Sequence, residues 1–397
     1  MRKMPEIVKE PGKNRFSSAE RIGELLADKI KKDDHFYFFS PDETTSNKLD
    51  AVFAVTDRAW DLPEKPWDLP EDENGRIIEL LSENILFATM SGHVLGNREP
   101  AMMASYEAFY NVITSQIIQH LKFLKQAEKV DWQKKYPAIN LLSTSTCWRQ
   151  DHNGFTHQSP ALISTLLSIP NAKANCIFPV DDVAASATFD YMLKSQNVVN
   201  LTTFNKTNEP RWIDIHHAKF QFENGGASLF GFASDENPDY VFTAAGDIPT
   251  REALYAINIL KEDIPGIRLR FVGINSLTYN AIGTCDNKLS QQKFDELFGQ
   301  EKPIIANFHG YPETLKIILE KYTDQYRLRV HGFMEEGTTT TPFEMLNLNH
   351  ASRYDLALEV AKMMNRYDLI EKYQSILIAN YAHASEFGED LPELMVE

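Results

Sequence analysis

The spacing of apolar and polar positions along the chain predicts helices and strands in alternation. The first helix is the clearest, because Ser17 and Glu20 have capping-box spacing and an apolar stripe at helical intervals follows them. The stripe consists of Ile22, Leu25, Leu26 and Ile30 and ends at Lys31 and Lys32. A short aromatic strand at 35–39 comes next, followed by a polar loop at 40–48. Residues 61–74, rich in Pro, Asp and Glu, predict an exposed excursion.

The rest of the first half continues with a long helix and a parallel sheet. The helix is predicted at 105–126, from apolar residues at helical spacing, and a strand follows at 138–142. A strand, a helix and a second strand are then predicted at 175–180, 181–195 and 198–204. This βαβ unit implies parallel strands, because a crossover connection joins them.

Periodicity weakens over 205–238, and the alternation then restarts. Strands are predicted at 240–245, 267–274, 303–308 and 327–331, and helices at 249–260, 291–298 and 313–321, with two more helices closing the chain. We therefore predict an α/β protein of two domains, each a mostly parallel sheet flanked by helices. The boundary is placed inside the weak segment, which gives domains of residues 1–212 and 213–397.

Composition narrows the class of function. The chain has 397 residues and a formal charge of −16, which argues against binding to nucleic acids or anionic membranes. No apolar run approaches the roughly 20 residues that cross a bilayer, and we see no signal peptide. Cys147, Cys176 and Cys285 are widely spaced, which favours reduced thiols in a cytoplasmic protein. Neither CxxC nor HExxH occurs, so no metal site is predicted.

One polar stretch stands out as candidate chemistry. Residues 148–158 read WRQDHNGFTHQ and come soon after the apolar strand at 138–142. A strand that ends in a dense polar loop is typical of sites in open α/β sheets. Its cationic, amide and imidazole groups suit a phosphorylated, hydroxyl-rich ligand and the movement of protons on it.

This stretch and several others resemble the C-terminal half of phosphoketolases, which split xylulose 5-phosphate, and often fructose 6-phosphate, with phosphate to give acetyl phosphate. The matching blocks occur in the family order and cover nearly the whole chain. They are PDETTSN at 41–47, LSE at 81–83, SYEAF at 105–109, QH at 119–120, WRQDHNGFTHQ at 148–158, AGD at 245–247 and GTTTTPF at 337–343. Two of the shorter blocks, SYEAF and LSE, would be weak signals alone.

The resemblance implies a transketolase-like fold and the cofactor thiamine diphosphate. Residues 1–212 resemble the pyrimidine-binding domain and residues 213–397 the C-terminal domain. An N-terminal domain that holds the diphosphate with Mg²⁺ or Ca²⁺ is absent by this resemblance, because the thiamine signature Gly-Asp-Gly does not occur. Its nearest match, at Gly246 and Asp247, lacks the second glycine.

The resemblance also assigns site residues. Glu83 matches the glutamate that bonds the cofactor's aminopyrimidine ring, and Phe109 matches the aromatic residue that stacks on it. The catalytic set is completed by Gln150, His152 and His157. The residues that the resemblance assigns to contacts with sugar hydroxyl groups or phosphate are Ser46, Lys48, Tyr106, His152, Asn153 and Lys206. Without the resemblance, Glu83 would be an ordinary helix-surface acid, Phe109 a core residue, and the histidines structural.

The expected function is phosphate-dependent C–C cleavage of a ketose phosphate, by a homodimer that needs an N-terminal phosphoketolase half. Two departures from the family pattern bear on this expectation: Lys48 replaces the usual arginine and loses its bidentate fork, and Asn84 replaces the usual histidine. The alternatives are a noncatalytic oligomerisation or regulatory module of the same fold, and a transketolase-like transferase component.

Overall fold

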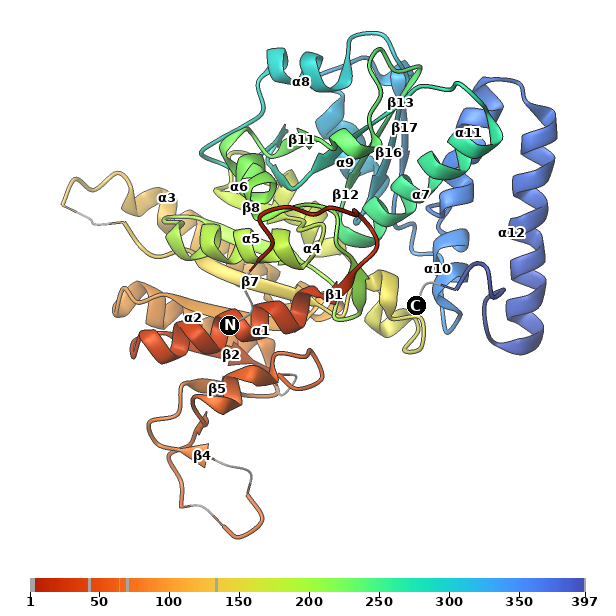
Figure 1. Cartoon of the computed structure of the whole chain (residues 1–397). Coiled ribbons are helices and arrows are strands. Elements are labelled where there is room, and N and C mark those ends of the chain that lie inside the picture. Colours follow the sequence, from red (N-terminus) through yellow and green to blue (C-terminus); the bar gives the residue numbers. More distant parts are fainter. Residues whose placement is uncertain (1–3, 42–43, 64, 69–70, 133–134, 396–397) are drawn as a thin grey trace. The chain divides into compact units, whose positions relative to one another are not determined.

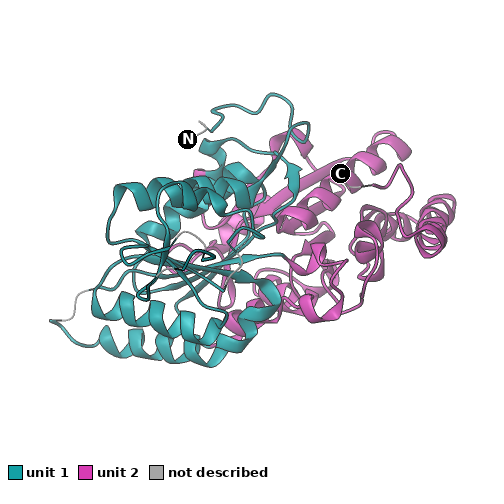
Figure 2. Ribbon diagram, turned by 90° about the horizontal axis from the view of Figure 1, so that it is seen from below, with its two compact units in different colours: residues 1–145, 170–218 teal, residues 146–169, 219–397 magenta. Residues whose placement is uncertain are grey.

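A computed structural model describes residues 4–41, 44–63, 65–68, 71–132 and 135–395 (Figure 1). Two residues of the 41–47 block and three of the excursion at 61–74 lie outside them. The chain forms two compact units (Figure 2). The first unit comprises Met1–Ser145 and Pro170–Ala218, and the second comprises Thr146–Ile169 and Lys219–Glu397. The segment at 146–169 therefore belongs to the second unit, although it precedes the boundary predicted at 212/213.

The first unit contains a parallel sheet. Its strands lie in the order β8-β9-β7-β6-β2-β5-β3-β4, and every pairing between neighbours is parallel. The strands are β2 (Tyr37–Ser40), β3 (Arg58–Ala59), β4 (Glu71–Asp72), β5 (Ile77–Glu79), β6 (Ala101–Tyr106), β7 (Ile139–Thr144), β8 (Ala174–Ile177) and β9 (Val199–Thr203). A separate antiparallel pair joins β1 (Arg15–Ser17) to β10 (Asn208–Pro210). The predicted βαβ unit is confirmed, since β8 and β9 are parallel neighbours joined by α5 (Asp182–Lys194).

Helices cover both faces of this sheet (Figure 2). The connections β5–α2–β6 and β6–α3–β7 run in one direction across the sheet, so right-handed crossovers put α2 (Glu83–Gly96) and α3 (Thr114–Ala127) on one face. The β8–α5–β9 connection runs the opposite way, which puts α5 on the other face, where α1 (Ser18–Lys32) packs against it. As predicted, Ser17 caps α1, and its hydroxyl accepts from the Glu20 amide at 3.1 Å.

The predicted helix at 105–126 is wrong over its first nine positions. Residues 101–106 form the central strand β6, residues 107–113 form the 3₁₀ helix η2 (Glu107–Ile113), and α3 begins only at Thr114. A strand buried on both faces shows no alternation of apolar and polar residues, so its pattern resembles that of a buried helix. Tyr106 and Phe109 therefore do not share a face of an α-helix.

The second unit contains a five-stranded sheet in the order β11-β13-β12-β16-β17. Its strands are β11 (Ala227–Leu229), β12 (Tyr240–Ala245), β13 (Leu269–Ile274), β16 (Ile304–Phe308) and β17 (Leu328–His331). All neighbours pair in parallel except β11, which is antiparallel to β13. A short hairpin of β14 (Ser276–Thr278) and β15 (Ala281–Ile282) follows β13. Both sheets confirm the predicted α/β class.

Three helices of the second unit confirm predicted ones: α7 (Asp247–Asp263), α8 (Gln291–Phe298) and α9 (Pro312–Leu319). Two further helices were not predicted: α4 (Ala161–Ser168), and α6 (Ile215–Glu223), which spans the division between the units. Three helices close the chain rather than the predicted two: α10 (Pro342–Leu348), α11 (Arg353–Met363) and α12 (Tyr367–Phe387). Among the described residues, no helix combines the length and the apolar character that spanning a bilayer requires.

Candidate active site

The carboxyl edge of the first unit's sheet gathers six of the ten predicted site residues. They come directly after four parallel strands, β2, β5, β6 and β9, or end one of them. These residues are Ser46, Lys48, Glu83, Tyr106, Phe109 and Lys206. Ligands of open α/β sheets bind beyond the carboxyl ends of the strands, so this edge is where a site is expected.

Glu83 is the first residue of α2, which begins at the N-cap Ser82. Its carboxylate oxygen Oε1 accepts a hydrogen bond from Ser105 Oγ at 3.2 Å, from the neighbouring strand β6. Two apolar residues beside it in sequence are exposed, Leu81 at 86% and Ile85 at 55%. Glu83 is thus fixed by a hydroxyl group and lies in an exposed, apolar stretch of the surface.

An aromatic and cationic cluster lies around Tyr106. Phe109 stacks on the Tyr106 ring with 5.8 Å between centroids and 12° between planes. A 3₁₀ helix has three residues per turn, so side chains three positions apart lie above one another, which accounts for this stacking. Tyr106 Oη donates to Ser46 Oγ at 3.2 Å, and Lys206 Nζ lies 5.2 Å from the centre of the Tyr106 ring. Four predicted site residues are therefore in contact.

Lys48 is held differently from the cluster around Tyr106. Its backbone is left-handed, with φ of 59°, and its Nζ forms an ion pair with Glu20 Oε1 at 3.0 Å. Both side chains are about half exposed. Glu20 was not predicted as a site residue, because its position in the sequence indicates only a capping role in α1.

Two other residues of the first unit support Glu83 without having been predicted to do so. Ser105 belongs to the SYEAF block, and neither Ser105 nor Gln116 was predicted as a site residue. Gln116 Nε2, on α3, donates to the backbone oxygen of Asn84 at 3.2 Å, one residue after Glu83. The spacing of residues along the chain carries no signal for either contact, because each joins separate elements.

The other four predicted residues lie in the second unit, on residues 150–158, here called the histidine loop. Gln150 is fully buried, and its Oε1 accepts from Asn153 Nδ2 at 2.6 Å. His152 and Asn153 are exposed. His157 is half-buried, and its Nδ1 lies 2.8 Å from Thr156 Oγ1. The loop thus presents an imidazole and an amide to solvent above a buried glutamine.

Asp151 gives this loop an acid whose charge is disfavoured. Burial raises the pKa of its carboxyl, while the charges of Arg149 and His152 oppose that rise. Asp151 Oδ1 lies 3.9 Å from Arg149 Nε, and Oδ2 lies 4.0 Å from His152 Nδ1. Arg149 and the loop after it therefore combine a cation, a partly buried acid and an exposed imidazole, the groups that proton transfer and phosphate binding use.

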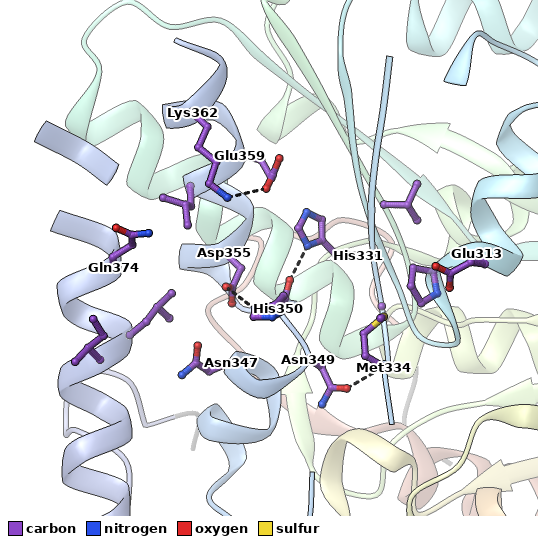
Figure 3. Close-up of a pocket in the computed structure, with 16 residues that line it drawn as sticks. Glu313, His331, Met334, Asn347, Asn349, His350, Asp355, Glu359, Lys362 and Gln374 are labelled. Carbon is purple, nitrogen blue, oxygen red and sulfur yellow. Dashed lines mark hydrogen bonds and ion pairs between the residues drawn. The ribbon is translucent and has the colours of Figure 1, made fainter. Parts of the chain in front are cut away.

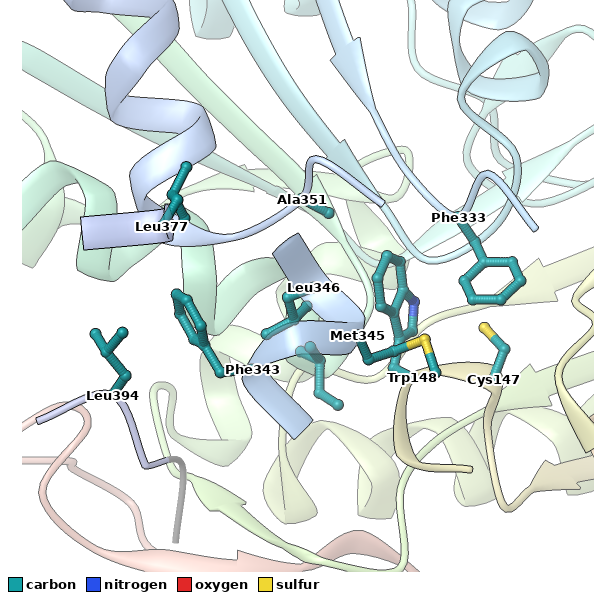
Figure 4. Close-up of a cluster of buried hydrophobic side chains, with 10 residues drawn as sticks. Cys147, Trp148, Phe333, Phe343, Met345, Leu346, Ala351, Leu377 and Leu394 are labelled. Atoms are coloured by element: carbon teal, nitrogen blue, oxygen red, sulfur yellow. The ribbon is translucent and has the colours of Figure 1, made fainter. Parts of the chain in front are cut away.

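A buried apolar cluster anchors the start of the histidine loop (Figure 4). Cys147 and Trp148 pack in this cluster with residues that follow β17 and with α10, and Trp148 meets Phe333 edge-on at 5.3 Å between centroids. Trp148 Nε1 donates to the backbone oxygen of His309 at 3.0 Å, immediately after β16. The loop is thereby fixed near the carboxyl edge of the second unit's sheet.

Residues 337–341, here called the threonine loop, follow β17 and precede α10. Thr341 caps α10, since its side chain accepts from the Glu344 amide before the first turn that holds Pro342. Gln158 Nε2 donates to the Thr338 backbone oxygen at 3.0 Å. Two family blocks that lie far apart in the sequence, at 148–158 and 337–343, are therefore in contact.

A cavity of about 740 Å³ lies elsewhere in the second unit (Figure 3). Its walls come from β17 and from α9 to α12, and His331, His350 and Glu359 line it. The backbone oxygen of His350 accepts from His331 Nδ1 at 2.6 Å, and Lys362 Nζ donates to Glu359 Oε1 at 3.3 Å. None of the ten predicted site residues lines this cavity.

Comparison with known sequences identifies the family. A model of the D-xylulose 5-phosphate/D-fructose 6-phosphate phosphoketolase family matches residues 20–195, and the XFP C-terminal domain model matches residues 206–396. A probable phosphoketolase of Pseudomonas putida is 35% identical over 395 residues, which cover 97% of this chain and 50% of that protein.

Solved structures show the same fold at low sequence identity. Transketolase from Leishmania mexicana superposes with a TM-score of 0.67 at 13% identity, covering 90% of this chain and 47% of that one. A split-gene transketolase, described as an inactive β4 tetramer, superposes with a TM-score of 0.59 at 14% identity, covering 87% of this chain and 98% of that one. The fold is transketolase-like, and the chain belongs to the phosphoketolase family, spanning about half the length of the curated relatives it matches.

Proposed function

We propose that this chain forms the pyrimidine-side part of a phosphoketolase active site. The reaction is the cleavage of xylulose 5-phosphate, or fructose 6-phosphate, by inorganic phosphate to give acetyl phosphate and an aldose phosphate. The observation that carries the proposal is the position of Glu83 at the carboxyl edge of a parallel sheet, hydrogen-bonded by Ser105, at the edge that also bears the cluster around Tyr106.

The residues present fit the pyrimidine end of thiamine diphosphate. A carboxylate at a helix start is suited to bond a ring nitrogen, and Phe109 offers an aromatic ring for stacking. When bound, this cofactor supplies the carbon nucleophile and the electron sink for C–C cleavage. In the proposal Glu83 holds a proton at the pyrimidine ring, and Ser105 keeps its carboxylate in place.

A diphosphate-binding half, which also holds Mg²⁺ or Ca²⁺, is the partner in this proposal. Apolar residues near Glu83 in sequence are exposed: Leu80, Leu81 and Ile85 are between 42% and 86% accessible. Exposed apolar surface of this kind is typical of an interface that another domain covers. The curated relatives are about twice as long as this chain, which agrees with a second half of that kind. In this proposal the active protein is a homodimer, and each of its two parts consists of this chain and a diphosphate-binding half.

Each unit, taken by itself, offers polar residues that suit part of a sugar phosphate. Lys206, Ser46 and Tyr106 offer a cation and two hydroxyl groups in mutual contact, which suits a phosphate group. In the histidine loop, His152 and Asn153 are exposed to contact sugar hydroxyl groups. His157 is the candidate for moving protons during cleavage, since an imidazole exchanges protons near neutral pH.

The test is to combine this chain with the N-terminal half of a phosphoketolase. Acetyl phosphate formation is measured from xylulose 5-phosphate with phosphate, magnesium and thiamine diphosphate. The proposal predicts activity with both halves and none with either half alone. A complex that copurifies without activity would contradict it and favour a noncatalytic module.

The acceptor substrate distinguishes a phosphoketolase from the remaining alternative, a transketolase-like transferase component. With an aldose phosphate in place of inorganic phosphate, a transferase would form a longer ketose phosphate, whereas the proposal predicts acetyl phosphate only when inorganic phosphate is present. Parallel assays with fructose 6-phosphate then decide the preference between five-carbon and six-carbon substrates.

A further inference from the structure

The threonine loop lies directly against the histidine loop in the second unit. The Thr340 amide donates to the Asp151 backbone oxygen at 3.0 Å. Gly154 has a left-handed backbone, with φ of 70°, and a methyl group built on it would lie 3.4 Å from Thr339 Oγ1. The Thr339 hydroxyl is therefore next to the backbone between Asn153 and Phe155. The two loops therefore lie against each other at Asp151 and at Gly154, on either side of the exposed His152 and Asn153.

Gln158 connects the two loops through its side chain. Its Nε2 donates to the Gln150 backbone oxygen at 2.9 Å and to the Thr338 backbone oxygen at 3.0 Å. The residue is 2% exposed, so water does not compete for these carbonyl groups. One amide group thus fixes the first turn of the histidine loop to the start of the threonine loop.

Only an uncharged amide fits this position. Both partners are carbonyl oxygens, which accept hydrogen bonds, so the side chain must supply two N–H donors from one atom. The same argument fixes the orientation of the amide, because a flipped group would place its oxygen against two oxygens. A glutamate has no such donors when ionised.

The other end of this amide is not satisfied by hydrogen bonding. Gln158 Oε1 is buried and has no hydrogen-bond partner among the described residues. A methyl group built on Gly337 would lie 3.0 Å from this oxygen, so the threonine loop packs closely around it. A buried acceptor without a partner costs free energy. Gln158 therefore stabilises this arrangement through its two N–H donors and not through its oxygen.

We infer that Gln158 is a positioning residue that joins the two loops into one substrate-binding surface. On that surface the exposed hydroxyl groups of Thr338 and Thr339 bind the same hydroxyl-rich sugar phosphate as His152 and Asn153. This inference rests on the proposed function. It adds the threonine loop to the substrate site and gives a reason for its contact with the histidine loop.

Hydrogen–deuterium exchange on the full chain tests the joining of the loops. Gln158→Ala should accelerate amide exchange about tenfold in peptides of both loops, since each loses a hydrogen bond to the same side chain. Gln221→Ala is the matched control: Gln221 is also 2% exposed, its Nε2 donates to Gly273 O at 3.4 Å, and its Oε1 likewise has no described partner. Acceleration confined to one loop, or equal in the control, overturns the inference.

Exchange in the presence of xylulose 5-phosphate, using the chain combined with a diphosphate-binding half, tests the shared surface. The inference predicts protection of both loops, loss of that protection in Gln158→Ala, and weaker protection in Thr339→Val. Protection of the histidine loop alone contradicts the inference and leaves the proposed function standing. An inactive complex would instead contradict the proposed function, while exchange without substrate still decides whether Gln158 joins the loops.

In an active complex, the kinetic constants separate binding from folding. Thr339→Val should raise KM for the sugar phosphate about threefold to tenfold with kcat unchanged, as expected for the loss of one neutral hydrogen bond. Gln158→Glu should not restore the KM of Gln158→Ala, because a carboxylate cannot donate to two carbonyl oxygens. An unchanged KM in Thr339→Val would exclude its hydroxyl from the substrate site.

Discussion

At the scale of single residues, the two lysines assigned to the substrate phosphate are held in different ways. Lys206 lies against the face of Tyr106, which leaves its charge without an anion in that contact. Lys48 Nζ is paired with Glu20 at 3.0 Å. A substrate phosphate must compete with Glu20 for Lys48. A lysine also lacks the planar fork with which an arginine could bind both anions.

Glu20→Gln should therefore lower KM for the sugar phosphate. Exposed ion pairs contribute up to about 1 kcal/mol, so the decrease should reach at most about fivefold, with kcat unchanged. Glutamine keeps the length of the side chain and the helix N-terminus. Glu10→Gln serves as control, because it breaks another exposed pair, with Lys13 at 2.8 Å. Steady-state kinetics that show equal KM for both variants would remove Lys48 from the phosphate site.

Tyr106→Phe tests the hydroxyl group of the aromatic cluster. The variant keeps the ring that stacks on Phe109 and faces Lys206, and it loses the hydroxyl group that donates to Ser46. KM for the sugar phosphate should rise about threefold to tenfold, the value of one neutral hydrogen bond. A fall in thermal stability at constant KM would show that this hydroxyl is structural.

Candidate site residues could be named from the sequence, but the contacts that join them could not. Glu83 and Tyr106 could be assigned from family blocks because each block is a short run of consecutive residues. The contacts Ser105–Glu83 and Lys48–Glu20 join residues 22 and 28 positions apart. Such contacts arise only when the sheet brings separate strands and helices together, and a single sequence carries no record of them.

At the scale of elements, α3 fixes the helix that begins with Glu83. Gln116 donates to the backbone of Asn84 near the start of α2, and His120 Nδ1 lies 3.0 Å from Ser91 Oγ two turns later. His120 is 4% exposed, and burial lowers the pKa of its imidazole to about 4. The contact between the two helices therefore depends on a neutral histidine.

This histidine should make the chain less stable in mild acid. Its folded-state pKa lies below the ordinary value of 6.5, so the unfolded chain binds the proton more tightly. The contribution of the neutral imidazole to the free energy of unfolding is complete above pH 6.5 and is lost as the pH falls towards 4. The loss is about 2 kcal/mol between pH 7 and pH 5. Urea unfolding at these two pH values measures the loss. His120→Asn should remove most of it.

Ser91→Ala is the matched control for this titration. It deletes the hydrogen bond but keeps the buried imidazole, so the loss of stability between pH 7 and pH 5 should persist. An equal pH dependence in His120→Asn and the unmodified chain would show that other groups govern the acid sensitivity.

Most elements could be predicted from periodicity, and the failure that affects the candidate site has a physical cause. Surface helices such as α1 and α8 were placed within a residue or two, because one face is apolar and the other polar. Strand β6 is buried at five of its six residues and has no such alternation, so it was merged with the helix that follows it. The cluster around Tyr106 lies at this junction, where the chain changes from strand to 3₁₀ helix.

At the scale of the whole molecule, two mostly parallel sheets each carry candidate site residues near their carboxyl edges. The first unit contributes Glu83 and the cluster around Tyr106, and the second contributes the histidine loop. The segment at 146–169 joins the second unit because Trp148 packs in that unit's core. The sequence placed this loop with the first domain, since order along the chain does not reveal which core a tryptophan enters.

The most direct test of the account is the acetyl phosphate activity of Glu83→Gln, assayed after the chain is combined with an N-terminal phosphoketolase half. Glu313→Gln is the control, because Glu313 is likewise an acid in the first turn of a helix. The account predicts a loss of about 100-fold or more for Glu83→Gln, as for the removal of a group that transfers protons, and no loss for Glu313→Gln. Equal activity of the two variants would contradict it, since Glu83 would then have no role in catalysis.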